Sequence, residues 1–152
     1  MNIDRFKREH EDILSQIAAL RRLAHAGVAQ NASEIAQRIV AMSSTIRLHL
    51  AVEDRLLYPA LQASGSEALA QLGARFQHEM GEIAGGYMAF ARRWNTAERV
   101  AADPEGFRND ANTVLRSVHE RMRHEDRDFY PRIEAAGDEA RPGFAPPFSP
   151  AF

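Results

Sequence analysis

A histidine and a glutamate stand one helical turn apart on the apolar face of a long predicted helix, and they constrain the fold more than any other residues. His49 and Glu53 continue a series of apolar residues that recur at alternating steps of four and three. The series consists of Ile35, Ile39, Met42, Ile46 and, beyond Glu53, Leu56. Because this spacing places all of them on one face of a helix, the imidazole and the carboxylate are expected in the core. A buried charge without a partner is costly, so both groups must be hydrogen-bonded or bind a metal ion.

The rest of the chain shows the same helical periodicity and predicts four amphipathic helices. Their expected spans are about residues 3–25, from a cap at 31 or 33 to about 63, 67–94, and 103–137. Short connections between such helices favour an antiparallel up-down-up-down arrangement. The sequence therefore predicts an all-α four-helix bundle over residues 1–136, followed by a Pro- and Phe-rich tail at 137–152.

Two local features interrupt the predicted helices. Pro59 lies in the last turns of the second helix and is expected to kink it or end it early. Gly85 and Gly86 weaken the third helix, and we attribute this pair to close packing against a neighbour.

The composition limits the chemistry and the partners. The chain has no cysteine, so any metal ion must be held by histidine and carboxylate groups. A net charge of -2 with interspersed acids and bases gives no reason to expect a nucleic-acid partner. No apolar run approaches the roughly 18 residues of a membrane span. We therefore expect a cytoplasmic protein that binds neither nucleic acid nor membranes.

An internal repeat relates the second helix to the fourth. Residues 49–59 align with residues 121–131, and this alignment places Glu53 opposite Glu125. Each glutamate precedes a Tyr-Pro pair by the same number of residues. The two helices are therefore expected to present equivalent carboxylates to one core, as in bundles with a central cofactor.

With these motifs in place, the chain resembles the hemerythrin-like, or HHE cation-binding, family. The matching segments are His10-Glu11-Asp12, His49 to Pro59, His78-Glu79, and Glu125 to Pro131. The resemblance covers about residues 1–136. It implies a bundle with a non-haem di-iron centre held by histidines and bridging carboxylates, which the family uses for oxygen binding, redox or nitric-oxide sensing, and iron handling.

The chain departs from that pattern on the third and fourth helices. Arg121 stands where the family supplies a histidine, and a guanidinium is not an ordinary metal ligand. On the third helix, the helical spacing turns Glu79 toward the core more than His78. The ligand candidates are therefore His10, His49, Glu53, Glu79 and Glu125, with His78, Glu82 and His119 as secondary candidates.

Three functions remain open at this stage. The first is a protein that binds one or two non-haem iron ions and responds to oxygen, nitric oxide or iron, since a carboxylate-rich site argues against oxygen carriage. The second is a metal-free regulatory interaction module in which Arg121 pairs with Glu53 or Glu125. The third is a di-iron carboxylate oxidase or an iron-storage protein. The absence of the Glu-x-x-His pairs that such proteins carry argues against this third function. Whether the protein is an enzyme stays open, and the pattern favours a role without catalysis.

The tail from residue 137 repeats phenylalanine every fourth residue among prolines. This pattern is typical of an extended segment that docks aromatic side chains into a groove on a partner protein, on a second copy or on its own bundle. The alternative is a disordered tail.

Overall fold

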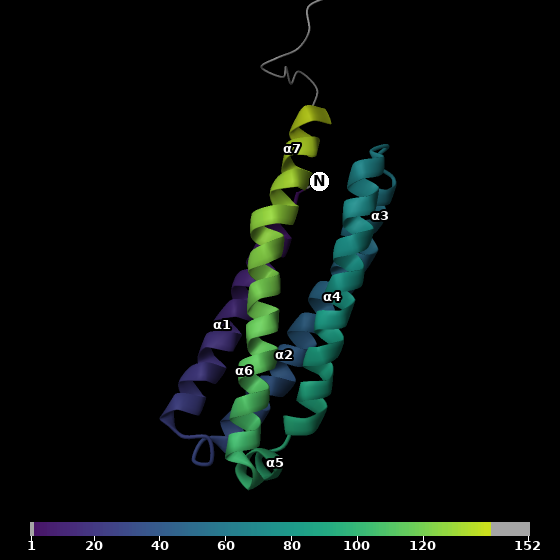
Figure 1. The fold of residues 1–152 in the computed structure, drawn as a ribbon. Helices are drawn as coiled ribbons and strands as arrows, with labels where there is room; N and C mark the ends of the chain where they lie inside the picture. The colour runs from purple at the N-terminus through teal and green to yellow at the C-terminus, as the bar shows by residue number, and fades with distance from the viewer. Residues whose placement is uncertain (1, 141–152) are drawn as a thin grey trace, which may run out of the picture.

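The computed structural model describes residues 2–140, without the side chains of 138–140, and these residues are helical apart from short connections (Figure 1). No strand occurs within that range, so the prediction of an all-α fold is confirmed. The longer helices are α1 (Asp4–Ala26), α2 (Ala32–Val52), α4 (Glu67–Trp94), α6 (Pro104–His124) and α7 (Tyr130–Ala140). The shorter elements are the π turns η1 (Glu53–Leu57) and η2 (Glu125–Phe129) and the helices α3 (Tyr58–Gln62) and α5 (Ala97–Ala102).

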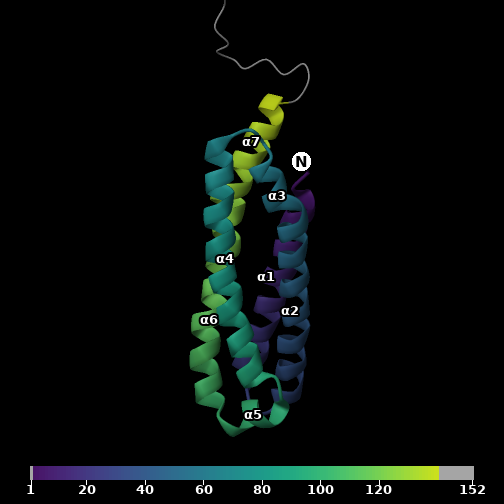
Figure 2. The ribbon, with the colours of Figure 1, turned by 90° about the vertical axis from the view of Figure 1, so that its right-hand side faces the viewer.

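The long helices lie side by side around one core. α1 packs against α2 and α6, and α4 packs against the same two helices. The first residues, α3 and α7 lie at one end of the molecule, and α5 lies at the other (Figures 1 and 2). Helix α5 was not predicted as a helix. It begins where the hydroxyl of Thr96 accepts a hydrogen bond from the amide of Arg99, and it buries Val100.

The apolar core consists of two clusters with buried polar residues between them. The larger cluster extends toward α5 and includes Ile13, Ile46 and Met122. The smaller one lies toward α3 and α7, and its members are Ile3, Phe6, Leu57, Tyr58, Leu61, Leu72, Phe76, Phe129, Tyr130 and Ile133. On each of three helical stretches, buried histidines or glutamates stand between the two clusters in sequence as well as in space. The bundle therefore encloses a polar layer between two apolar layers.

Two π turns continue α2 and α6 without a break in the chain. In each turn the amide of a tyrosine reaches back five residues, from Tyr58 to the carbonyl of Glu53 and from Tyr130 to that of Glu125. A proline follows each tyrosine. Because a proline ring crowds the carbonyl four residues earlier, a wider turn relieves the clash. Pro59 was expected to kink the helix or end it early. The structure instead shows a local widening of the helix before Pro59.

The π turn also corrects the predicted apolar stripe. Leu56, which was expected in the core, is 50% exposed, whereas its neighbour Leu57 is fully buried. A π turn holds one residue more than an α turn, so the inward face moves along the chain by one position. The stripe predicted from a constant helical period is therefore wrong beyond Glu53.

Two other local expectations were wrong. A Cβ atom on Gly85 or Gly86 would meet no neighbouring atom within 4 Å, so this pair does not mark close packing. Close packing occurs instead at Gly73, where a Cβ atom would stand 2.8 Å from Cδ1 of Leu61. The last helix continues to Ala140 rather than ending at Gly137, and the expected tail lies otherwise outside the described residues.

None of the helices in the described range combines the length and the hydropathy that crossing a bilayer requires.

Candidate metal centre

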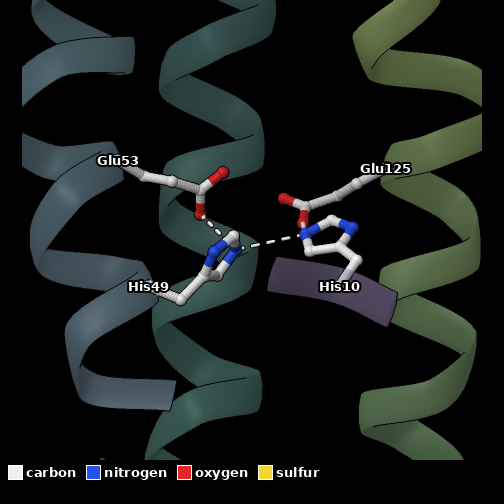
Figure 3. Close-up of side chains that lie close together, drawn as sticks. All are labelled: His10, His49, Glu53 and Glu125. Carbon is white, nitrogen blue, oxygen red and sulfur yellow. Dashed lines mark hydrogen bonds and ion pairs between the residues drawn. The ribbon is translucent and has the colours of Figure 1, made fainter. Parts of the chain in front are cut away.

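Two histidine side chains meet in the polar layer with their ring nitrogens facing one another. His10 comes from the second turn of α1 and His49 from the last turn of α2, and both are buried. Their Nε2 atoms are 3.1 Å apart (Figure 3). The predicted inward positions of both residues are confirmed by this burial. The two imidazoles present their Nε2 atoms to one point at the centre of the bundle.

Two carboxylates from the π turns complete this cluster. Oε1 of Glu53 lies 3.1 Å from Nε2 of His49, and Oε1 of Glu125 lies 3.1 Å from Nε2 of His10. Both glutamates are fully buried, and each is the first residue of its π turn. The internal repeat therefore does bring two equivalent carboxylates to one core (Figure 3).

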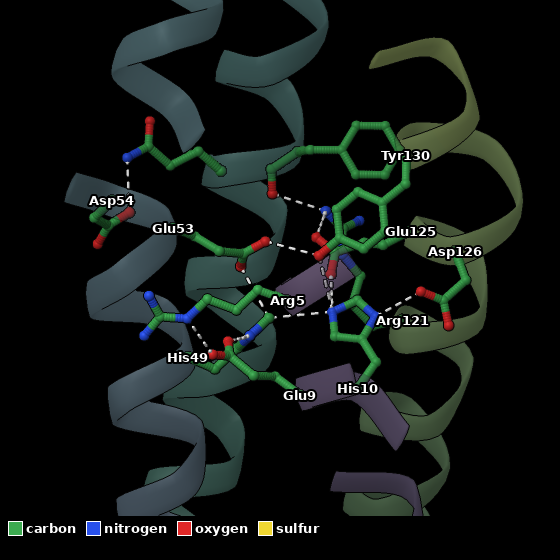
Figure 4. A network of polar contacts seen from close by, with 12 residues as sticks. Arg5, Glu9, His10, His49, Glu53, Asp54, Arg121, Glu125, Asp126 and Tyr130 are labelled. Atoms are coloured by element: carbon green, nitrogen blue, oxygen red, sulfur yellow. Dashed lines mark hydrogen bonds and ion pairs between the residues drawn. The ribbon is translucent and has the colours of Figure 1, made fainter. Parts of the chain in front are cut away.

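A second pair of carboxylates fixes the orientation of the two imidazoles from outside. Nδ1 of His10 donates to Oδ1 of Asp126 at 2.8 Å, and Nδ1 of His49 donates to Oε1 of Glu9 at 2.6 Å (Figure 4). Since an ionised carboxylate can only accept, the proton in each pair belongs to the imidazole Nδ1. This arrangement turns Nε2 of each ring inward, as in the carboxylate–histidine–metal arrangements of metalloproteins.

Tyr130 closes the cluster on the side of α7. Its hydroxyl donates to Oε2 of Glu53 at 2.9 Å and lies 3.1 Å from Nε2 of His10 (Figure 4). Tyr58 occupies the equivalent position in the repeat, but its buried hydroxyl has no hydrogen-bond partner among the described residues. The two halves of the repeat therefore differ at their tyrosines.

The electrostatics reflect a dense group of acids and bases away from water. Burial lowers the pKa of His10, but Asp126 and Glu125 outweigh it and raise the pKa to about 9. For His49, burial is likewise outweighed by Glu53, so its pKa is also raised. Burial raises the pKa of Glu125. The surrounding carboxylates therefore favour binding of a cation at the imidazoles, either a proton or a metal ion.

The donor set fits a metal ion. The ligand atoms of His10, His49, Glu53 and Glu125 all lie within 4.8 Å of one another. Within residues 2–140, neither carboxylate oxygen of Glu125 nor Oε1 of Glu53 has an aligned hydrogen-bond donor. Buried acceptors of this kind are costly unless a cation or a donor compensates them. Nitrogen and oxygen ligands in this combination suit iron, zinc or manganese.

Arg121 lies next to this cluster and is held by α4. Its side chain is 6% exposed, and its guanidinium stands over the ring of Phe76 at 4.4 Å. Nη1 donates to Oε2 of Glu79 at 2.9 Å, and Nη2 donates to the carbonyl of Phe76 at 2.7 Å. Nη2 is also 3.6 Å from Oε2 of Glu125. Of the two core carboxylates expected to pair with Arg121, Glu125 lies near it at the longer distance. The closer partner of Arg121 is Glu79, which is outside the core.

The remaining candidates are not brought to the cluster. The side chain of Glu79 is 46% exposed and accepts a hydrogen bond from Arg121, and it does not belong to the group of converging ligand atoms. His78 and Glu82 are largely exposed and pair with each other at 3.3 Å on the surface of α4. His119 is partly buried on α6 and does not belong to the group of converging ligand atoms.

Three residues of the site were missed by reasoning from the sequence. Glu9, Asp126 and Tyr130 were not among the candidate residues, although Asp126 and Tyr130 lie within the matching segment from Glu125 to Pro131. The signal for Glu9 and Asp126 is their position immediately beside His10 and Glu125. The signal for Tyr130 is the repeated Tyr-Pro pair, whose meaning depends on a π turn that periodicity does not reveal.

Comparison with known proteins identifies one related family. A family model described as the hemerythrin HHE cation binding domain matches residues 1–133. No curated protein and no solved structure matches the chain.

Proposed function

The chain belongs to the hemerythrin HHE cation-binding domain family, and from this premise we propose that it binds non-haem iron and responds to oxygen, nitric oxide or iron. We propose His10, His49, Glu53 and Glu125 as ligands. Glu79, a ligand candidate in the sequence, is left out because Arg121 engages it. The family membership supports a cation as the ligand, and the buried cluster supports the position of the site.

One observation carries the proposal. Two imidazoles have their Nδ1 atoms fixed by outer carboxylates and turn their Nε2 atoms to within 3.1 Å of each other. Two buried ring nitrogens at that distance, each 3.1 Å from a glutamate oxygen, need a shared proton or a metal cation between or beside them. A core held by hydrogen bonds alone would pair each buried acceptor with a donor, whereas among the described residues both oxygens of Glu125 and Oε1 of Glu53 have no hydrogen-bond partner.

Iron bound there would supply reversible ligation of a diatomic molecule or a change of oxidation state. The residues of the chain would prepare the site for it. Asp126 and Glu9 hold the imidazole tautomers, and Tyr130 offers a hydroxyl donor beside Glu53. The apolar layers on both sides keep bulk water away.

As part of the same proposal, the long helices form an up-down-up-down bundle in a cytoplasmic protein.

The first test is elemental analysis of untagged protein that is expressed with ample iron and purified without oxygen. We expect iron to copurify with the wild-type chain. We expect His49→Ala to lose that iron, because one of the two inward nitrogen ligands is removed. The matched control is His78→Ala, which removes an exposed imidazole and should retain the metal.

Two outcomes would contradict the proposal. A folded, helical wild-type protein without metal would show that the cluster is held by protons alone. Equal iron content in both variants would show that the metal binds elsewhere.

A second function is favoured by Arg121. A buried guanidinium beside Glu125 could neutralise part of the cluster without metal, which suits an interaction module that keeps the family architecture. The same elemental analysis separates the two, since this module binds no iron. In that case, a partner protein would be sought through the residues after 137, whose docking role stays a prediction.

A further inference from the structure

We infer that the centre holds a single metal ion and that the guanidinium of Arg121 takes the place of a second cation. The inference rests on the proposed function, since it concerns how many ions the site holds. Three observations support it: the size of the cluster, the engagement of the second oxygens of Glu53 and Glu125 by other groups, and the contacts by which α4 holds Arg121.

The cluster has the size of one coordination sphere. Bonds from a metal ion to nitrogen or oxygen ligands are about 2.0–2.2 Å long, so ligands on opposite sides of one ion are roughly 4.2 Å apart. The four ligand atoms of the cluster lie within 4.8 Å of one another. Two ions in a shared site stand about 3.5–4 Å apart and need further ligands on their outer sides.

The chain has few further donors to offer to a second ion. The second oxygen of Glu53 already accepts from the hydroxyl of Tyr130. The second oxygen of Glu125 faces Nη2 of Arg121 at 3.6 Å. Within the described residues, no other histidine or acid belongs to the converging group. A second ion would therefore lack ligands on the side of α4.

That side is occupied by a cation that α4 holds in place. Arg121 is fixed by Glu79, by the carbonyl of Phe76 and by the face of the Phe76 ring. A guanidinium stays protonated at all accessible pH values, so its charge cannot be removed to admit a metal ion. Moving it out would break two hydrogen bonds and remove the guanidinium from the face of the Phe76 ring.

The charge balance leads to the same number of ions. Glu53 and Glu125 supply two negative charges when ionised, and Arg121 returns one positive charge. One divalent ion would leave the buried group with a single positive charge, which the partly exposed Glu9 and Asp126 offset from outside. A second divalent ion would add two further positive charges to this buried region, at a large desolvation cost.

The experiment is an iron titration of the full-length chain under anaerobic conditions, with bound iron counted per chain. We expect one iron per wild-type chain. Arg121→His replaces the cation by a ligand nitrogen and releases Glu79, so we expect its stoichiometry to rise toward two. Arg123→His is the matched control, because it places a histidine on the exposed side of the same helix and should still bind one.

The outcomes separate this inference from the proposed function. Two irons per wild-type chain would overturn the single-ion site and leave iron binding intact, whereas no iron would overturn both. A stoichiometry of one in a folded Arg121→His chain would show that Arg121 is not what excludes the second ion. If that variant does not fold, Arg121→Lys, which keeps the charge, should still bind one iron, and a value of two would overturn the inference.

A spectroscopic measurement on the wild-type chain gives an independent answer. After oxidation, an isolated high-spin ferric ion has unpaired electrons that give a strong EPR signal. Two ferric ions bridged by oxygen couple their spins and are silent. We expect signal intensity equivalent to the total bound iron, and a silent spectrum from an iron-loaded protein would contradict the single-ion site.

Discussion

At the scale of single residues, the outer carboxylates decide what the inner imidazoles can bind. Asp126 and Glu9 each accept a hydrogen bond from Nδ1 of a buried histidine, and this leaves Nε2 to bind either a proton or a metal ion. An ionised acceptor at Nδ1 also makes the ring a stronger ligand. Side chains that never touch the metal ion would therefore control its affinity.

We predict that Asp126→Asn and Glu9→Gln each lower the affinity for iron by about 10–100-fold, which is typical for the loss of such outer partners. Each neutral amide keeps the shape of the side chain but removes the charge behind the imidazole. Competition with a chelator of known affinity measures the effect. Glu11→Gln, on the exposed side of α1, is the control and should bind iron as the wild type does. Unchanged affinity in both test variants would mean that the outer carboxylates do not support the ligands.

Neighbouring leucines provide a second prediction at this scale. Leu57 is fully buried in the smaller apolar cluster, whereas Leu56 is half exposed. We predict that Leu57→Ala lowers the free energy of unfolding by about 2–5 kcal/mol, and that Leu56→Ala changes it by about 0.5 kcal/mol or less. Urea denaturation followed by circular dichroism measures both. A larger loss for Leu56→Ala would place the inward face where an uninterrupted α-helix would have it.

At the scale of elements, the two π turns set the register of the helical stretches that cross the site. Each begins at a carboxylate of the cluster and ends just before a tyrosine of the apolar layer. The additional residue lets Glu53 and Tyr58 both face inward, although they are five positions apart. Irregular turns of this kind are frequent at functional sites.

We predict that deleting Arg55 from η1 costs far less stability than deleting Arg47 from α2, although both arginines are exposed. Without Arg55 the π turn can become an α turn, and the residues on both sides keep their faces. The cost should be about 3 kcal/mol, from the Pro59 ring against the preceding turn. Without Arg47, His49 and Glu53 rotate by roughly 100° out of the core, a change that exceeds what marginal stability tolerates.

Thermal unfolding of the two deletion variants measures the difference. The Arg55 deletion should show a cooperative transition at a lower midpoint, and the Arg47 deletion should show little cooperative unfolding at all. Similar transitions in the two would mean that the π turn does not store the extra residue.

The sequence predicts the helices well where their helical period is constant and poorly where a π turn interrupts it. The bounds of α1 and α4 were predicted to within a residue or two, because Ile13, Ile17 and Leu20 on α1 and similar series on α4 keep a constant helical period. The period fails beyond Glu53, since nothing in a regular 3.6-residue pattern signals a wider turn. Leu56 was placed in the core for this reason, and the structure buries Leu57 instead.

The site was predictable where burial alone decides the position of a side chain. His10, His49, Glu53 and Glu125 stand on apolar stripes and are buried as predicted, while their role as ligands stays a prediction. Glu79 shows where such reasoning ends. Its position on the helix allows an inward carboxylate, but the contact with Arg121 from another helix determines where that carboxylate goes.

At the scale of the whole molecule, the polar layer joins three of the long helical stretches and leaves the fourth to a different kind of contact. The cluster takes its members from α1, α2, η1 and η2. Helix α4 supplies none of them and is tied to the layer through Arg121 instead. Metal binding should therefore stabilise some helices of the bundle more than others.

We predict that iron raises the melting midpoint and slows amide exchange most in α1, α2 and α6, because these helices carry the ligands or run directly into them. A ligand that binds only the folded chain contributes about 2.7 kcal/mol when its concentration is 100 times the dissociation constant, which corresponds to roughly 5–10 °C for a domain of this size. Hydrogen exchange with and without iron locates the gain. His49→Ala should show neither effect. Equal protection of α4 would mean that a ligand from that helix belongs to the centre, since slower exchange follows the elements that the metal holds together.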